Sequence, residues 1–202
     1  MNKCLVCYKT IEQTFNGLFK ENCKLCYNCM NKFKIRNQKF KIEGVEGLVL
    51  YYYDDFFKDI LYRYKGCGDY LLKDCFLIND LKNKYRGYCV VLAPSNKDGE
   101  IKRGFNHLES IFLNFKMPII KCFRKTKKWK QSSKKIEERK NIQNIIKLDK
   151  NGLIGVKKVL IVDDVMTSGS TIKTMIRQMP SNIHKKVLVL ASNCRFLANE
   201  IV

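Results

Sequence analysis

Short apolar runs alternate with segments of helical periodicity along most of the chain. Runs rich in β-branched or aromatic residues predict strands at residues 47–55, 87–94, 117–123, 158–163 and 185–192. Apolar residues that recur every three or four positions predict helices at residues 56–65, 66–85, 105–115 and 171–179. The charged residues 96–104 are interpreted as a loop. This alternation predicts an α/β fold with a parallel sheet and right-handed crossovers.

The strand predicted at 158–163 leads into an unusual polar stretch. Its apolar residues, Val159 to Val162, are followed by two acids and then by small residues that precede a helix. Ligands of parallel sheets bind at the carboxyl ends of strands, and a helix N-terminus attracts anions. The stretch therefore predicts a site for a phosphorylated sugar or nucleotide, made of Asp163, Asp164, Val165, Met166, Thr167, Ser168, Gly169, Ser170 and Thr171.

The first forty residues contain half of the ten cysteines. Two C-x2-C pairs separated by a loop are typical of tetrahedral zinc sites, in which four filled positions make the metal structural. We favour Cys4, Cys7, Cys26 and Cys29 as ligands, and Cys23 is the alternative to Cys26. The expected organisation is a cysteine-rich zinc-binding module at 1–42 and a larger domain at 43–202. The remaining cysteines are interpreted as small core residues.

Composition places the chain among globular proteins. Hydrophobic residues make up 46% of its 202 residues, and no apolar run approaches the ~20 residues that span a bilayer. The first residues lack the apolar segment of a signal peptide. We therefore expect a cytoplasmic protein without a membrane span, whose cysteines bind metal or lie in the core rather than forming disulfides.

The formal net charge of +20 favours a polyanionic partner, nucleic acid first. Residues 124–141 are too charged to lie in a core. Cations that surround the only tryptophan suit a single strand, because a base can stack on the ring while phosphates meet the lysines. The candidate nucleic-acid contacts are Lys125, Lys127, Lys128, Trp129 and Lys130.

The phosphate stretch resembles the PRPP-binding signature of type I phosphoribosyltransferases (PRPP is phosphoribosyl pyrophosphate). Over nearly its whole length the chain also resembles the ComF family of competence-associated proteins. This resemblance rests on the N-terminal cysteine pairs, "RGFN" at 103–106, Gln131 with "ERKN" at 138–141, and "VDDVMTSGST" at 162–171. It implies a type I phosphoribosyltransferase-like parallel sheet with flanking helices and a small N-terminal zinc-binding module.

The resemblance also implies roles for individual residues. Asp163 and Asp164 would accept hydrogen bonds from the ribose 2′- and 3′-hydroxyls of PRPP, and residues 167–171 would surround its 5′-phosphate. Residues 94–104 would lie near the pyrophosphate and its Mg²⁺, with Arg103 as a cation and Gly104 beside it. Residues 124–141 would correspond to a loop that closes over the site.

The function implied is a ComF-like role in DNA uptake for natural transformation. Expected partners are PRPP, single-stranded DNA and a ComF-type competence ATPase or helicase, with the protein beside the uptake machinery at the inner membrane face. The alternative is an active phosphoribosyltransferase that acts on a base or nucleotide without direct DNA contact. No general base is evident, and His107 is interpreted as an ordinary surface or interhelical histidine, so the catalytic residues are not assigned.

Overall fold

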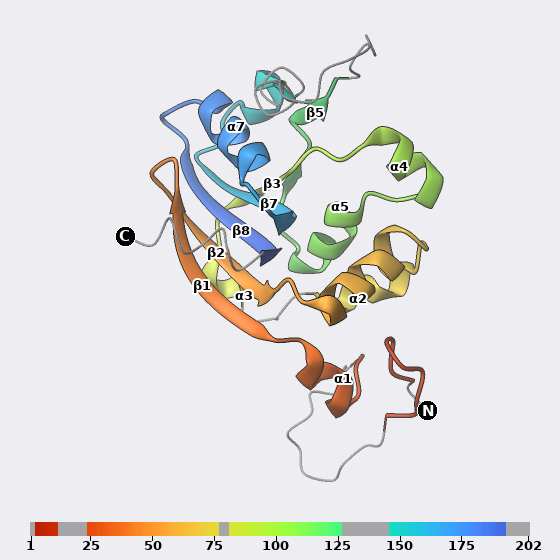
Figure 1. The fold of residues 1–202 in the computed structure, drawn as a ribbon. Coiled ribbons are helices and arrows are strands. Elements are labelled where there is room, and N and C mark those ends of the chain that lie inside the picture. The colour runs from red at the N-terminus through yellow and green to blue at the C-terminus, as the bar shows by residue number, and fades with distance from the viewer. Residues whose placement is uncertain (1–2, 12–23, 77–80, 127–145, 193–202) are drawn as a thin grey trace, which may run out of the picture.

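A computed structural model describes residues 3–11, 24–76, 81–126 and 146–192. Its centre is a six-stranded sheet with the order β1-β2-β8-β7-β3-β4 (Figure 1). Neighbours are parallel except for β1 and β2, which are antiparallel. The strands are β1 (Ile35–Ile42), β2 (Val45–Tyr52), β3 (Cys89–Leu92), β4 (Ile119–Ile120), β7 (Lys158–Met166) and β8 (His184–Ser192).

Helices and a small second sheet surround these strands. The antiparallel pair β5 (Phe123–Lys125) and β6 (Ile146–Leu148) lies at the top of Figure 1. The α-helices are α1 (Tyr27–Lys32), α2 (Asp55–Lys65), α3 (Leu81–Lys84), α4 (Lys97–Arg103), α5 (His107–Phe112) and α7 (Ser170–Gln178). Short 3₁₀ turns are η1 (Tyr70–Cys75), η2 (Leu113–Phe115) and η4 (Lys150–Leu153). Among the described residues, no helix is long and apolar enough to cross a membrane.

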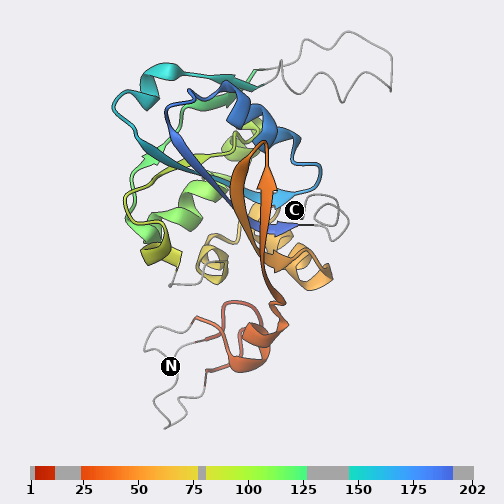
Figure 2. The same ribbon diagram turned by 90° about the vertical axis from the view of Figure 1, so that its left-hand side faces the viewer.

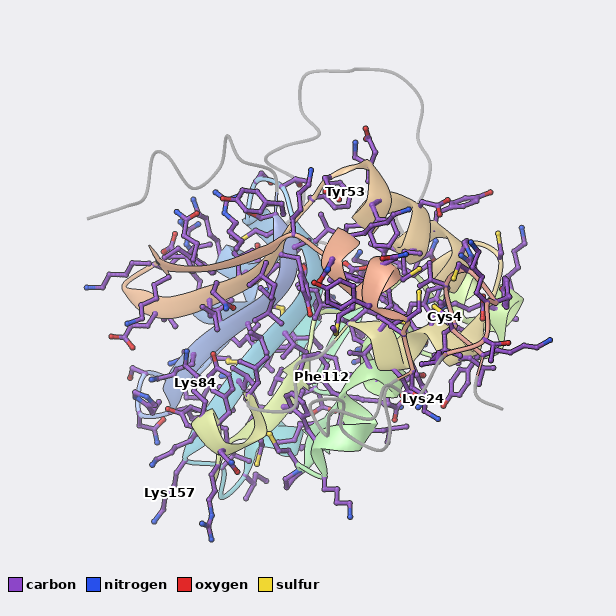
Figure 3. All side chains as sticks on the ribbon, turned by 90° about the horizontal axis from the view of Figure 1, so that it is seen from below. Cys4, Lys24, Tyr53, Lys84, Phe112 and Lys157 are labelled. Atoms are coloured by element: carbon purple, nitrogen blue, oxygen red, sulfur yellow. The ribbon has the colours of Figure 1, made fainter. Side chains whose placement is uncertain are left out.

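The two central strands form the core. Residues 159–162 of β7 and 187–190 of β8 are fully buried, as a strand covered on both faces requires. The ring of Phe112, labelled in Figure 3, is also fully buried, in the interior beside the sheet. The predicted parallel sheet is therefore confirmed, and it fixes where the end of β7 lies.

The N-terminal cysteines and α1 form a separate lobe below the sheet in Figures 1 and 2. The chain leaves this lobe directly into β1, the edge strand of the main sheet. Residues 35–42 thus belong to the sheet, although they fall within the range 1–42 assigned to the cysteine module from the sequence. The division of the chain into two domains stays a prediction.

Several predicted elements differ in detail. The expected loop at 96–104 contains α4, because Asn96 caps the helix through Asp98 N and Gly104 ends it at a φ of 81°. The predicted helix at 66–85 is represented by η1 and α3, and residues 77–80 lie outside the described part. Strand β7 continues to Met166, three residues beyond the predicted end at residue 163, so Asp163 and Asp164 both lie within it.

Candidate functional site

The turn between β7 and α7 begins the candidate site. Strand β7 ends at Met166, and Gly169 occupies the N-cap of α7 with a φ of 67°, a conformation that favours glycine. Exposed Thr167 and Ser168 lie before it, and Ser168 Oγ donates to Ser170 Oγ at 3.0 Å. This turn therefore brings hydroxyl groups and the N-terminus of a nine-residue helix together, which suits a phosphate group.

Asp163 and Asp164 point to opposite faces of the sheet because they are successive residues of one strand. Asp164 is only 7% exposed. Its Oδ2 accepts hydrogen bonds from Lys65 Nζ at the end of α2 and from His107 Nε2 at the start of α5, the latter at 3.2 Å. Its Oδ1 accepts from Val165 N at 2.8 Å. Three elements thus meet at one buried carboxylate.

His107 links this carboxylate to Arg103. Arg103 Nη2 lies 3.1 Å from His107 Nδ1, and Arg103 Nε donates to the Phe105 carbonyl at 2.9 Å. A guanidinium can only donate, so Nδ1 accepts and the proton of the neutral ring is on Nε2, where it donates to Asp164. The Tyr64 hydroxyl also donates to the His107 carbonyl at 2.8 Å, so it helps to fix the position of His107.

The charges at the site follow from this geometry. Burial raises the pKa of Asp164, but the hydrogen bond from His107 and the positive charge of Lys65 together hold it well below the usual range. Burial lowers the pKa of His107, against the opposing effect of Asp164. Burial and the charge of Asp164 raise the pKa of Asp163. At neutral pH these pKa shifts favour an anionic Asp164 with the neutral imidazole of His107 beside it.

The segment before α5 is held by polar contacts of its own. Glu100 accepts hydrogen bonds from the Ser95 hydroxyl and from the Asn106 amide. Asn106 also caps α5 by accepting from Glu109 N at 3.0 Å. These contacts fix the helix and turn that carry Arg103 and Gly104, so the cation predicted for this segment reaches the same site as Asp164.

The four favoured cysteines lie together. The sulfur atoms of Cys4, Cys7, Cys26 and Cys29 are all within 4.8 Å of one another, and Cys7 Sγ lies 3.7 Å from Cys26 Sγ. A tetrahedron with Zn–S bonds of ~2.3 Å has edges of about 3.8 Å, so these thiols fit a zinc ion. Cys23, the alternative ligand, lies outside the described residues.

Backbone donors also suit a thiolate at this cluster. Burial raises the pKa of the Cys4 thiol, but the N–H groups of Cys26, Cys7 and Val6 that face its sulfur lower it to about 6. Figure 3 labels Cys4 in this lobe. The other described cysteines lie apart from the cluster, and of these Cys75 and Cys122 are buried, as expected for core residues, whereas Cys67 is exposed.

Arg63 of α2 ties the cysteine lobe to the main fold. Its guanidinium donates to the Val6 carbonyl at 2.9 Å and to the Leu5 carbonyl at 3.4 Å. It also donates to Tyr8 Oη at 2.9 Å and forms an ion pair with Asp69 at 3.3 Å. Leu5 and Val6 are the two residues between Cys4 and Cys7, so Arg63 holds the turn of the first cysteine pair.

The sequence alone did not identify Lys65 or His107 as site residues. His107 is 4% exposed and hydrogen-bonded to Asp164, so its interpretation as an ordinary surface or interhelical histidine is incomplete. The signal in the sequence that could have identified His107 is its position four residues after Arg103, the cation already expected at the site. For Lys65, a lysine at a helix end, no such signal exists. Of the candidate nucleic-acid residues, Lys125 ends β5 and is exposed, and residues 127–130 lie outside the described part.

One protein-family model matches much of the second half of the chain. The model of the "Phosphoribosyl transferase domain" matches residues 108–189, which include β7, α7 and all of α5 except its first residue, His107. Adenine phosphoribosyltransferase from Saccharomyces cerevisiae aligns with a TM-score of 0.44 at 13% identity, over 84% of this chain and 90% of that chain. The domain match and the mostly parallel sheet confirm the predicted fold class, type I phosphoribosyltransferase-like.

Two relatives align over most of the chain. Competence protein ComFC of Streptococcus pneumoniae (strain ATCC BAA-255 / R6) is 30% identical over 167 residues, which cover 80% of this chain and 75% of that protein. Competence protein ComFC of Bacillus subtilis (strain 168) is 25% identical over 205 residues, covering 84% of this chain and 85% of that protein. Both alignments are longer than the matched phosphoribosyltransferase domain at residues 108–189, so the similarity to these relatives extends beyond that domain.

Proposed function

The chain belongs to the ComFC family of competence proteins, and on this premise we propose that it acts in DNA uptake for natural transformation through a site that binds PRPP. We further propose that it binds single-stranded DNA and works with a ComF-type competence ATPase or helicase. Its expected place is the cytoplasm, beside the uptake machinery at the inner membrane face.

The observation that carries the PRPP proposal is the buried carboxylate of Asp164 beside the turn that starts α7. Lys65 and His107 keep this carboxylate ionised, so it can accept hydrogen bonds from sugar hydroxyls. Gly169 and the hydroxyl-rich turn lie a few residues further along the chain, where the N-terminus of α7 suits a terminal phosphate. One pocket would thus hold both ends of a ribose 5-phosphate.

Transfer from PRPP would break the bond between C1 of the ribose and a pyrophosphate oxygen and form a bond between C1 and a nucleophile. The ring gains positive charge as the bond breaks, and the anionic Asp164 stabilises that charge. Arg103 lies on the segment expected near the pyrophosphate and would offset the negative charge that develops there. Mg²⁺, when bound to the pyrophosphate, would supply further charge stabilisation.

A structural zinc ion is part of the same proposal. The four sulfur atoms fit tetrahedral coordination, and all four positions would be filled by protein, which leaves no open position for catalysis. The metal would therefore stabilise the lobe that Arg63 holds against α2.

Thermal unfolding with PRPP and Mg²⁺ tests the site. A ligand present at a hundred times its dissociation constant stabilises the folded protein by about 2.7 kcal/mol, so we expect a clear rise in melting temperature. Asp164→Asn should abolish the rise, whereas Asp59→Asn, an exposed acid on α2, should retain it. No rise at millimolar PRPP would contradict the proposal.

Pyrophosphate release distinguishes binding from transfer. PRPP, Mg²⁺ and a set of bases or nucleotides are supplied to the wild-type protein and to Asp164→Asn. Turnover that the variant loses would establish the alternative function, an active phosphoribosyltransferase. Stabilisation by PRPP without turnover would establish a PRPP-binding module.

A further inference from the structure

The edge strand β1 carries several cations and no acid. Residues 22–42 contain no acid, and they contain six basic residues: Lys24, Lys32, Lys34, Arg36, Lys39 and Lys41. Four of them lie on or next to β1, and the lysines among these four are exposed. We call Lys34, Arg36, Lys39 and Lys41 the β1 cation row. Figure 2 turns this edge of the sheet toward the viewer.

A bulge places the whole row on one face of the sheet. In a regular strand, residues 34 and 36 would face one side and residues 39 and 41 the other. The register with β2 shifts between Ile35 and Gln38, and Asn37 within the shift has a φ of 44°. Residues that face each other across two paired strands have their side chains on the same face. Lys34 lies opposite Tyr52, and beyond the bulge Lys39 lies opposite Leu48. Tyr52 and Leu48 are four residues apart on β2, so their side chains lie on the same face of the sheet. All four cations therefore share one face.

An exposed aromatic ring lies at the end of this row. Tyr52 is 39% exposed, and its N–H donates to the Lys34 carbonyl at 3.0 Å. The Arg36 guanidinium stacks over the Tyr52 ring at 4.8 Å from the ring centroid. The combination of a flat aromatic surface with a line of cations is the arrangement that single strands use, with a base on the ring and phosphates on the cations.

Few acids offset this charge within the described part of the chain. Glu46 shares the face and contacts Lys186 at 3.5 Å, and Asp54 contacts Lys34 at 3.4 Å. For Lys39 and Lys41, the described residues provide no ion pair. Exposed ion pairs such as that of Lys34 contribute little to stability, so a phosphate group can readily replace the carboxylate.

We propose that the β1 cation row and Tyr52 bind a single-stranded nucleic acid along the edge of the sheet. That the partner is a nucleic acid rests on the proposed function. That this surface binds it rests on the structure, because the bulge brings all four cations to one face. From Lys34 to Lys41 the strand extends about 23 Å at ~3.3 Å per residue, and alternate residues lie about 6.6 Å apart. A single row at this spacing matches one extended phosphodiester backbone rather than a planar membrane surface.

Fluorescence anisotropy of a labelled oligothymidylate tests the surface in the full chain. Each phosphate contact contributes about 0.7 to the slope of log affinity against log salt for a single strand. Lys39→Gln/Lys41→Gln should therefore lower the slope by about 1.4 and weaken binding about 25-fold at 0.1 M salt. Tyr52→Leu should weaken binding and leave the slope unchanged, because it removes stacking and no charge.

Matched variants keep the test specific. Lys116→Gln/Lys150→Gln makes the same change in charge at two exposed lysines outside β1, one shortly before β4 and one at the start of η4, and should bind as the wild type does. Lys39→Arg/Lys41→Arg should retain binding because it keeps both charges, and an unchanged melting temperature of the glutamine variant excludes misfolding as the cause of its loss. Unchanged binding of the oligonucleotide by Lys39→Gln/Lys41→Gln would overturn the proposal. So would an equal loss of binding in the Lys116→Gln/Lys150→Gln control, or a loss of binding that occurs only in Lys127→Gln/Lys128→Gln.

Further measurements separate this proposal from the PRPP site. The glutamine variant should keep its full stabilisation by PRPP and Mg²⁺, since β1 and the end of β7 are separated by two strands. Failure of PRPP to stabilise the wild type would leave the oligonucleotide result standing. Failure of the wild type to bind the oligonucleotide would overturn the β1 proposal together with the proposed DNA binding, and would leave the PRPP site untouched. Tighter retention on anionic vesicles than on DNA would also overturn the β1 proposal.

Discussion

Asp164 is held ionised by two neighbours of different kinds. Lys65 contributes a positive charge, and His107 donates a hydrogen bond from Nε2. Arg103 donates to Nδ1 of the same ring, which places the ring proton on Nε2. Because the carboxylate already has these partners, a sugar that binds there must add to the network or displace Lys65. The side chain of Lys65 is 34% exposed, so it has room to move aside.

The pH dependence of stability should report the state of His107. Burial lowers its pKa below the ordinary value of about 6.5, so the unfolded chain takes up this proton first as the pH falls. The stability that this group contributes is complete above about pH 6.5 and is lost as the pH falls toward the folded pKa. Melting curves between pH 8 and 5 should show this loss in the wild type.

His107→Gln provides the comparison for that measurement. Glutamine can accept from Arg103 and donate to Asp164, but it does not titrate. The difference in melting temperature between wild type and variant should therefore shrink as the pH falls below 6.5. A difference that is constant with pH would mean that His107 is not a buried neutral group.

Lys65 and Asp164 should be energetically coupled. Removing one partner of a buried pair leaves an uncompensated charge, and the partial exposure of Lys65 reduces the cost. We expect Lys65→Met to destabilise the protein by about 1–2 kcal/mol, and Lys65→Met/Asp164→Asn to cost less than the sum of the single changes. Urea unfolding of the four proteins measures the coupling. Strict additivity would contradict the contact.

Helix α2 connects two parts of the molecule. Arg63 holds the turn between Cys4 and Cys7, and two residues later Lys65 contacts the buried carboxylate of the candidate site. The helix is fixed at its start by Asp54, which accepts from Phe57 N at 2.9 Å. A change in the cysteine lobe therefore has a direct structural route to the site.

If the proposed zinc is present, Arg63→Gln should speed its release. The variant loses hydrogen bonds to the carbonyls of Leu5 and Val6, so the turn that carries two of the four thiols opens more often. Transfer of zinc to a coloured chelator measures the rate, and we expect an increase of about tenfold, equivalent to ~1.4 kcal/mol. Lys58→Gln on the same helix is the control, and equal rates in both would contradict the coupling.

Some elements could not be placed from hydrophobic pattern alone. The segment with α4 has a glycine and five charged residues, so its periodicity is weak, and the helix depends on the caps at Asn96 and Gly104. Strand β1 alternates poorly because the bulge at Asn37 interrupts the period of two. By contrast, β7 and β8 were predicted within three residues at each end because they are buried on both faces.

At the scale of the whole molecule, fold class and cysteine cluster were predictable, whereas the contacts of Asp164 were not. The sheet follows from strand and helix alternation, and the cluster follows from two short spacings in the sequence. Lys65 and His107 reach Asp164 from positions 99 and 57 residues earlier in the chain, and no local pattern encodes such a meeting. The long-range packing of α2 and α5 brings them together.

The cysteine lobe and the sheet should unfold together. Cys4, Leu25, Cys29 and Phe33 belong to the same hydrophobic cluster as the strands, and Phe33 contacts Tyr51 and Phe57 through its ring. If the proposed zinc is bound there, its removal by a chelator should therefore lower the temperature of one cooperative transition. An early separate transition, with the main one unmoved, would show that the lobe is an independent unit.

Isothermal titration of PRPP in the presence of Mg²⁺ tests the central claim most directly, which is that the end of β7 and the start of α7 form one pocket. We expect saturable binding to the wild type at one site per chain. Ribose 5-phosphate should bind more weakly, and Asp164→Asn should show no measurable heat. PRPP binding that is equally strong in Asp164→Asn, or absent from the wild type at millimolar concentrations, would contradict the account.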